Sequence, residues 1–225
     1  MKTGTYSYSP DKVDNGSTAL TVTLQTMNQF KLERVAWNDE KPDGNTSSSS
    51  AHSKGIIAYN YTANKGFLIV HSIPKYPAFD NHVVNNTIAD SENYYGQHIM
   101  CISLSLDQLE KVAYNLLITR PNVYETMVKS SSKNVYINEL AQKRWHSTTN
   151  LFTTYLMRPQ NIASIRSIYK NDLINGSIFE DGLTDLLKKN LVVESWGRPL
   201  EEAWCTDQYE VKNVQKVKIG EIEWN

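Results

Sequence analysis

The chain has 225 residues, which is more than one small core requires and short for two full domains, so one large domain is expected. A hydrophobic content of 40% and a charged content of 21% exclude an intrinsically disordered chain. The formal net charge of −1 excludes a strongly basic protein that would bind nucleic acid through its overall positive charge at neutral pH. Protonation of all five histidines would bring that charge to +4, so acid conditions would favour contact with phosphate groups.

Signals for location and cross-linking are few. No apolar run is long enough to cross a bilayer, and the N-terminal segment MKTGTYSYSPDKVDNG lacks the apolar centre of a signal peptide. Five N-x-[ST] sequons favour a secreted or lysosomal ancestor; they lie at Asn15, Asn45, Asn60, Asn85 and Asn175. The two cysteines, Cys101 and Cys205, either form one bridge or remain free thiols, and their number leaves both open.

Strand patterns dominate the first half of the chain. VAWND (35–39) predicts a short strand that runs into a polar, serine-rich loop. GIIAYNY (55–61) and GFLIVHS (66–72) are apolar, β-branched runs joined by TANK, a spacing typical of a hairpin. HIMCISLSL (98–106) predicts a third, strongly apolar strand.

Helical patterns follow. SLDQLEKVAYNLLI predicts a helix with Ser105 as its N-cap, one apolar face and an end at Pro121. A second amphipathic helix is expected to begin near Phe179, followed by a strand at LVVESWG (191–197) and an exposed strand at VKNVQKVKI (211–219). Because strands and helices are interleaved, the pattern predicts the α/β class.

His52 and Lys54 form an H-x-K triplet. On a strand, residues i and i+2 point to the same side. An imidazole beside an ammonium group can bind a phosphate ester and act on it. The imidazole attacks the phosphorus or protonates an ester oxygen, while the lysine stabilises charge on the non-bridging oxygens. A solvated loop histidine is the alternative for His52, and a structural histidine at a strand end is the alternative for His71. The histidines and cysteines show no metal-ligand spacing, so neither a metal nor another cofactor is expected.

Long segments of the chain resemble deoxyribonuclease II. They are AHSKG, FLIVHSIPKYP, YYGQHIMCISLSLDQLEKVAYNL, PNVYE and LVVESWGRP in that order, with VAWNDEKP upstream and CTDQYEVKNVQKVKIGEIEWN downstream. The resemblance implies an acid endonuclease of the phospholipase D superfamily that cuts DNA without a metal, leaves 3′-phosphate ends and works in lysosomes or outside cells. It also implies a phospholipase D-like mixed sheet flanked by helices. Residues 1–130 would form the half that carries the H-x-K triplet, and residues 131–225 an incomplete second half.

The resemblance also implies roles for individual residues. His52 and Lys54 match the first of two triplets that face each other across one site. One histidine would form a phosphohistidine and the other would protonate the leaving 5′-oxygen, with the assignment left open. His71 matches the histidine of the family's HSxP segment and would orient the site or contact phosphate. Lys75 and Tyr95 are candidate DNA contacts, to phosphate and by stacking, with a solvated lysine and a rim aromatic as the alternatives.

The second triplet is not found in this sequence. His71, His82, His98 and His146 are not followed by lysine two places later, and Asn225 falls within the family segment that precedes the second triplet. The chain alone is therefore expected to cleave DNA poorly or not at all, unless two chains face their single triplets in a homodimer. The alternatives are a catalytically impaired relative that binds nucleic acid, and a secreted interaction protein without a nucleic-acid role. No membrane partner is expected.

Overall fold

The computed structural model describes residues 11–129, 131, 133–148, 152–157, 164–171, 177–193, 204–205, 208–214, 216–219 and 222–224. By internal contacts the chain divides into two compact units. One spans Met1–Thr148 and Thr154–Tyr169, and the other spans Thr149–Thr153 and Lys170–Asn225. The division into halves at residue 130 stays a prediction.

A five-stranded antiparallel sheet forms the first unit, in the order β6-β3-β2-β1-β7. Its strands are β1 (Glu33–Asn38), β2 (Lys54–Asn60), β3 (Lys65–His71), β6 (Ile99–Ser105) and β7 (Val123–Met127). The predicted hairpin is confirmed, since β2 and β3 pair from Lys54↔His71 to Asn60↔Lys65. The strands predicted at 35–39 and 98–106 are also confirmed within two residues at each end.

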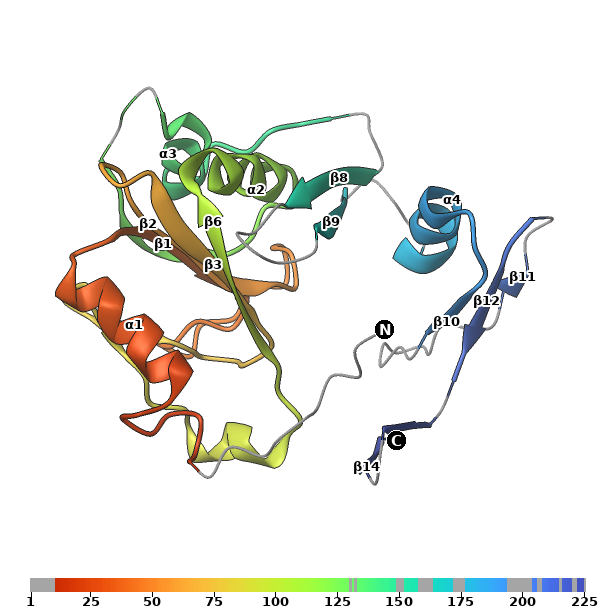
Figure 1. The fold of residues 1–225 in the computed structure, drawn as a ribbon, viewed down its shortest axis with the longest axis horizontal. Coiled ribbons are helices and arrows are strands. Elements are labelled where there is room, and N and C mark those ends of the chain that lie inside the picture. Colours follow the sequence, from red (N-terminus) through yellow and green to blue (C-terminus); the bar gives the residue numbers. More distant parts are fainter. Residues whose placement is uncertain are drawn as a thin grey trace. The chain divides into compact units, whose positions relative to one another are not determined.

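Helices cover both faces of this sheet, which confirms the α/β class (Figure 1). Helix α1 (Ala19–Gln29) packs on one face, while α2 (Leu106–Thr119) and α3 (Val135–Ala141) pack on the other. Helix α2 confirms the predicted helix. Ser105 holds its N-cap position but makes no side-chain capping hydrogen bond, and Arg120 ends the helix in a left-handed conformation.

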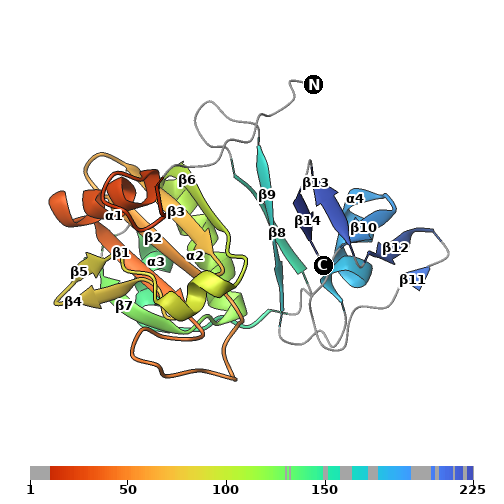
Figure 2. The same ribbon diagram turned by 90° about the horizontal axis from the view of Figure 1, so that it is seen from below.

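Shorter elements complete this part of the chain. The hairpin of β4 (Ala78–Asp80) and β5 (Val83–Asn85) lies beside α1 (Figure 2), and the 3-10 helix η1 (Asp90–Tyr94) follows it. Strands β8 (Phe152–Met157) and β9 (Ile165–Lys170) form a two-stranded sheet.

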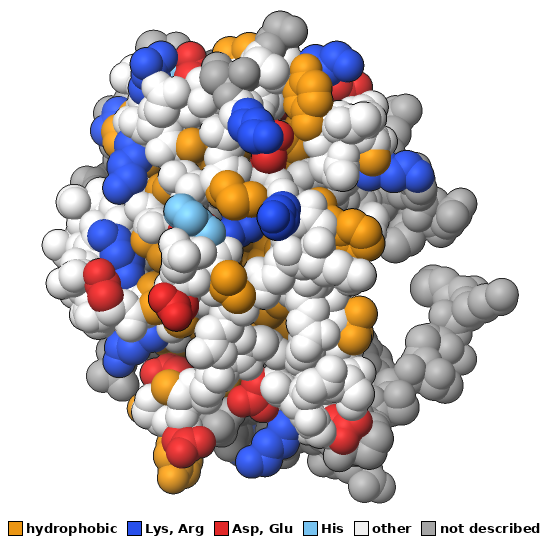
Figure 3. All heavy atoms as spheres, turned by 90° about the vertical axis from the view of Figure 1, so that its left-hand side faces the viewer, with side chains coloured by type: hydrophobic (Ala, Val, Ile, Leu, Met, Phe, Trp, Pro, Cys, Tyr) orange, Lys and Arg blue, Asp and Glu red, His pale blue; other side chains and the backbone are white. Residues whose placement is uncertain are grey.

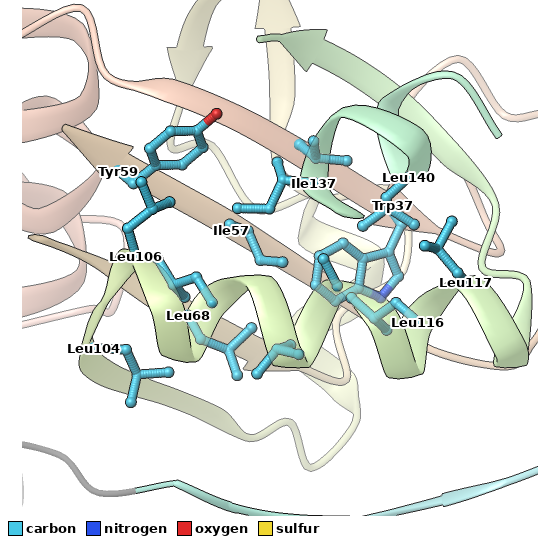
Figure 4. Packing of buried hydrophobic residues seen from close by; sticks show 14 of the residues in the cluster. Trp37, Ile57, Tyr59, Leu68, Leu104, Leu106, Leu116, Leu117, Ile137 and Leu140 are labelled. Atoms are coloured by element: carbon cyan, nitrogen blue, oxygen red, sulfur yellow. The ribbon is translucent and has the colours of Figure 1, made fainter. Parts of the chain in front are cut away.

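Two hydrophobic clusters sandwich the main sheet. Trp37, Ile57 and Tyr59 pack under α2 and α3 (Figure 4). Alternate residues such as Ile56 and Ile69 pack under α1. Because both faces are covered, the strands are continuous apolar runs rather than alternating patterns.

The second unit is smaller. It contains a π-helical turn η2 (Phe179–Leu183) that continues into α4 (Thr184–Leu187), which confirms the second predicted helix. Strands β10 (Leu191–Val193), β12 (Glu210–Asn213) and β11 (Trp204–Cys205) form a sheet in that spatial order. The rest of the predicted strand LVVESWG lies outside the described residues.

The tail differs from the single exposed strand that its alternation predicts. Strand β12 ends at Asn213, and β13 (Val217–Ile219) pairs instead with β14 (Ile222–Trp224). The two strands have different partners, which a pattern of alternation cannot reveal. Among the described residues, no helix is long and apolar enough to span a membrane.

The glycine that follows the triplet makes room for Trp37. A Cβ atom at Gly55 would lie 2.5 Å from the backbone oxygen of Ile69 and 2.5 Å from Cζ2 of Trp37. We expect Gly55→Ala to lower the free energy of unfolding by about 1–3 kcal/mol through overpacking. Urea titration followed by tryptophan fluorescence measures this. The control is Gly16→Ala, where a Cβ meets nothing within 4 Å; an equal loss in both variants would contradict the expectation.

Candidate functional site

One carboxylate brings His52 and Lys54 together. Lys54 is the first residue of β2, and His52 lies in the bend just before it. Asp39 follows the last residue of β1. Its Oδ2 lies 2.8 Å from Nδ1 of His52, and its Oδ1 accepts a hydrogen bond from Nζ of Lys54. The two side chains of the triplet therefore meet at Asp39.

The two side chains differ sharply in exposure. The side chain of His52 is 87% exposed, whereas those of Lys54 and Asp39 are 4% and 9% exposed. A buried ammonium group needs a counter-charge, and Asp39 supplies it. Because the Asp39 oxygen can only accept, we assign the proton on the neutral ring to Nδ1. This leaves Nε2 of His52 with a lone pair on the accessible side chain.

Asn38 fixes the position of Asp39. Its fully buried side chain donates to the backbone oxygens of Ile73, at 3.1 Å, and Tyr76, at 2.9 Å. Its Oδ1 accepts from the backbone N–H of Glu40 at 2.9 Å. These bonds tie the end of β1 to the segment after β3. The chain therefore turns at Asp39, and its carboxylate lies beside the start of β2.

His71 lies behind Lys54 instead of at the surface. It is the register partner of Lys54 in β3 and is 3% exposed. Its Nδ1 accepts from the backbone N–H of Ile73 at 3.2 Å, while its buried Nε2 has no hydrogen-bond partner among the described residues. Burial, together with the charge of Lys54, lowers the pKa of His71 to about 3. The ring therefore stays neutral at mildly acid pH, and contact with phosphate would require Nε2 to become exposed.

The other predicted contacts lie on exposed loops. The backbone N–H of Lys75 donates to the oxygen of Glu40 at 2.9 Å, so this exposed lysine belongs to the loop that packs against the Asp39 turn. Tyr95 is 70% exposed and lines a separate hollow of about 780 Å³ together with Leu20 and Cys101. Both DNA-binding roles stay predictions.

A small hollow lies next to the triplet. It has a volume of about 240 Å³ and is lined by Ser53 and Lys54, by Trp37 from β1 and by residues of β9 such as Tyr169. The indole N–H of Trp37 and the hydroxyl of Ser53 are buried there without a hydrogen-bond partner among the described residues. Across those residues, no group of three histidine, cysteine, aspartate or glutamate side chains could hold a metal ion.

Sequence reasoning missed Asp39 and Asn38. The sequence VAWND was assigned only to a strand, and the carboxylate that ends it is fifteen residues from Lys54. The available signal was the lysine at the start of an apolar run, because a lysine buried in a sheet requires an anion nearby.

The fold and this geometry define an α/β protein in which a buried carboxylate holds the accessible imidazole of His52 at the end of the central sheet. Comparison with known proteins gives the family. The chain belongs to the deoxyribonuclease II family, whose model, described as Deoxyribonuclease II, matches residues 1–225.

Several curated relatives are similar to the chain. Deoxyribonuclease-2-beta of Mus musculus is 25% identical over 192 residues, covering 82% of this chain and 52% of the relative. Plancitoxin-1 of Acanthaster planci is 30% identical over 219 residues, covering 93% and 60%. Cell death-related nuclease 6 of Caenorhabditis elegans is 27% identical over 212 residues, covering 91% and 53%. The chain thus spans about half to three-fifths of the length of these relatives.

Asp39 should contribute strongly to stability. We expect Asp39→Asn to lower the free energy of unfolding by about 3–5 kcal/mol, because it leaves the Lys54 ammonium buried and unpaired. Urea denaturation at neutral pH measures the loss. The double variant Asp39→Asn, Lys54→Met removes both charges and should recover a large part of it. A double variant no more stable than Asp39→Asn would contradict the pairing.

Stability should also fall in acid through His71. Above pH 6.5 its ring is neutral in both the folded and the unfolded chain, but between about pH 3 and 6.5 only the unfolded chain takes up the proton. At pH 5 this lowers the free energy of unfolding by about 2 kcal/mol relative to pH 7. We expect the pH dependence to become shallower in His71→Asn, measured as urea midpoints from pH 5 to 7. An unchanged slope in His71→Asn would refute the assignment.

Proposed function

We propose that the chain is a deoxyribonuclease II-like acid endonuclease, which hydrolyses DNA phosphodiester bonds to 3′-phosphate ends without a metal or other cofactor. The observation that carries the proposal is the accessible imidazole of His52, held through Nδ1 by the buried Asp39 carboxylate. Membership of the deoxyribonuclease II family supports DNA as the substrate.

The geometry favours His52 as the nucleophile. Its Nε2 lone pair would form a bond to phosphorus while the bond from phosphorus to the 5′-oxygen breaks. The leaving oxygen takes a proton from a second imidazole, and water then hydrolyses the phosphohistidine to release a 3′-phosphate. Asp39 would stabilise the positive charge that the His52 ring gains, since its oxygen lies 2.8 Å from Nδ1.

Lys54 would act through Asp39 in this scheme. Its ammonium group is buried against the carboxylate, so contact with a phosphate oxygen would require that bond to break. While the bond is intact, Lys54 fixes the position of Asp39 and hence of the His52 ring. We propose that Lys54, like Asp39, positions the imidazole, and that His71 behind them supports the same end of the sheet.

The second imidazole is the open requirement of this mechanism. The 225 residues contain one H-x-K triplet, at residues 52–54. A homodimer that places two His52 side chains across one phosphate would supply the proton donor. Activity would then rise faster than linearly with protein concentration, which gel filtration combined with the nuclease assay would detect.

A second candidate function is nucleic-acid binding without cleavage. The burial of Lys54 favours it, because the ammonium group of the triplet is engaged by Asp39 instead of being open to a phosphate oxygen. A catalytically impaired relative of this kind would bind DNA in a salt-sensitive manner at pH 5 without nicking it. An interaction protein without a nucleic-acid role would not bind DNA under those conditions.

A lysosomal or secreted location forms part of the proposal. It is supported by exposure of four sequon asparagines, Asn15, Asn45, Asn60 and Asn85. Asn175 lies outside the described residues. An unchanged mass after N-glycosidase treatment of the cell-derived protein would contradict glycosylation at these positions.

A plasmid-nicking assay at pH 5 in EDTA tests the activity. Because the chain carries a single triplet, we expect only slow nicking by paired chains, and we expect His52→Gln to lower that rate by about 10²–10⁴-fold because the reacting nitrogen is lost. The control is His98→Gln, which removes another exposed histidine. Nicking that survives in His52→Gln would refute the mechanism. DNA binding without nicking by the unaltered chain would establish the second candidate instead.

A further inference from the structure

A second exposed histidine is held by a buried carboxylate at the other end of β1. Nδ1 of His82 lies 2.9 Å from Oε1 of Glu125, with side chains 56% and 9% exposed. Nε of Arg34 lies 3.2 Å from the same oxygen, and its side chain is 2% exposed. The other two guanidinium nitrogens donate to the backbone oxygens of Leu32 and His82. Glu125 is therefore neutralised by Arg34 and also holds the His82 ring.

This cluster has the same construction as the one at Asp39. In each, a buried cation neutralises a buried carboxylate, and the carboxylate holds an exposed imidazole through Nδ1. Arg34 and Asp39 are five residues apart along β1, which at about 3.3 Å per residue separates them by roughly 16 Å. The His82 cluster is thus distinct from the H-x-K site.

His82 lines a groove with an excess of positive charge. The groove has a volume of about 770 Å³, and ligand sites commonly measure about 300–1,000 Å³. Lys31 and Lys129 also line it, and within the described ranges neither ammonium group has an ion-pair partner. Figure 3 looks onto the α1 side of the molecule, where lysine and arginine side chains are interspersed with acidic and uncharged ones.

Three carboxylates lie in or near the groove, and two of them are engaged. Glu33 accepts from the Tyr59 hydroxyl at 3.0 Å and from the backbone N–H of Lys129 at 2.8 Å. Glu125 and Arg34 compensate each other, and Asp80, two residues before His82, is exposed. Among the lining residues the two lysines therefore outweigh Glu33 by one charge, and by two when His82 is protonated.

Neutral donors add to these charges. The side-chain amides of Asn81, Asn138 and Gln142 line the same groove. Lysine, protonated histidine and amide groups all donate hydrogen bonds to phosphate oxygens, and none of them presents a competing negative charge. An extended chain of phosphates fits this mixture better than a neutral or cationic ligand.

We propose that this groove binds the phosphate backbone of a nucleic-acid strand, with Lys31, Lys129 and protonated His82 as the contacts. The groove lies away from His52, and binding of a strand there does not depend on cleavage of that strand. It rests on the proposed function only for the choice of DNA as the ligand.

Salt dependence of binding tests the lysine contacts. All samples carry His52→Gln so that the DNA stays intact, and anisotropy of a short single-stranded oligonucleotide is measured at pH 5 over a range of salt concentrations. The double variant Lys31→Gln, Lys129→Gln should reduce the slope of log affinity against log salt by about 1.4, the value for two lost phosphate contacts. The matched control, Lys65→Gln with Lys111→Gln, removes two exposed lysines elsewhere and should leave the slope unchanged.

Imidazole NMR signals test the place of binding. In a histidine-labelled chain, with His82 assigned through His82→Gln, the oligonucleotide should shift the His82 signal and leave that of His146 in place. A His82 shift produced by inorganic phosphate, together with equal slopes in the two double variants, would make the groove a free-phosphate site and overturn the proposal. No His82 shift with either probe would overturn it too. Failure of the nicking assay would instead affect only the catalytic proposal.

Discussion

The buried bond between Asp39 and Lys54 is the constraint on which the H-x-K end of the sheet depends. A lysine at the start of an apolar strand is stable only with a counter-charge, and that counter-charge lies at the end of the neighbouring strand. The same carboxylate then has one oxygen left, which orients His52. Asn38 holds the turn that places Asp39, so four side chains in and beside two strand ends position the accessible nitrogen of His52.

The local patterns predicted most of the main sheet and failed where packing outweighs propensity. The two apolar runs and the short polar connection between them determine the hairpin, and the leucine periodicity of 106–117 determines α2. Helix α1 was not predicted, because ALTVTLQTMNQ contains three threonines and a valine, which favour strands. Its Leu24 and Met27 are buried against the sheet, and this burial makes the segment a helix.

The candidate site was predictable only where its members are close in sequence. His52 and Lys54 are two residues apart, and the pattern identified both. Asp39 is fifteen residues from Lys54, and Glu125 is ninety-one from Arg34 and forty-three from His82. Such pairs depend on which strands become neighbours, and single-sequence periodicity carries no information about that. The burial of Lys54 and His71 has a similar origin: Lys54 begins β2, which lies between β1 and β3, and His71 ends β3, which lies between β2 and β6.

The buried, neutral ring of His71 behind Lys54 also affects the lifetime of the folded protein. The shift at His71 makes mild acid raise the unfolded fraction, by roughly thirtyfold for the 2 kcal/mol expected at pH 5. Proteases that cut transiently opened chains follow that population. In an acidic compartment, the buried ring of His71 would therefore shorten the lifetime of the folded molecule.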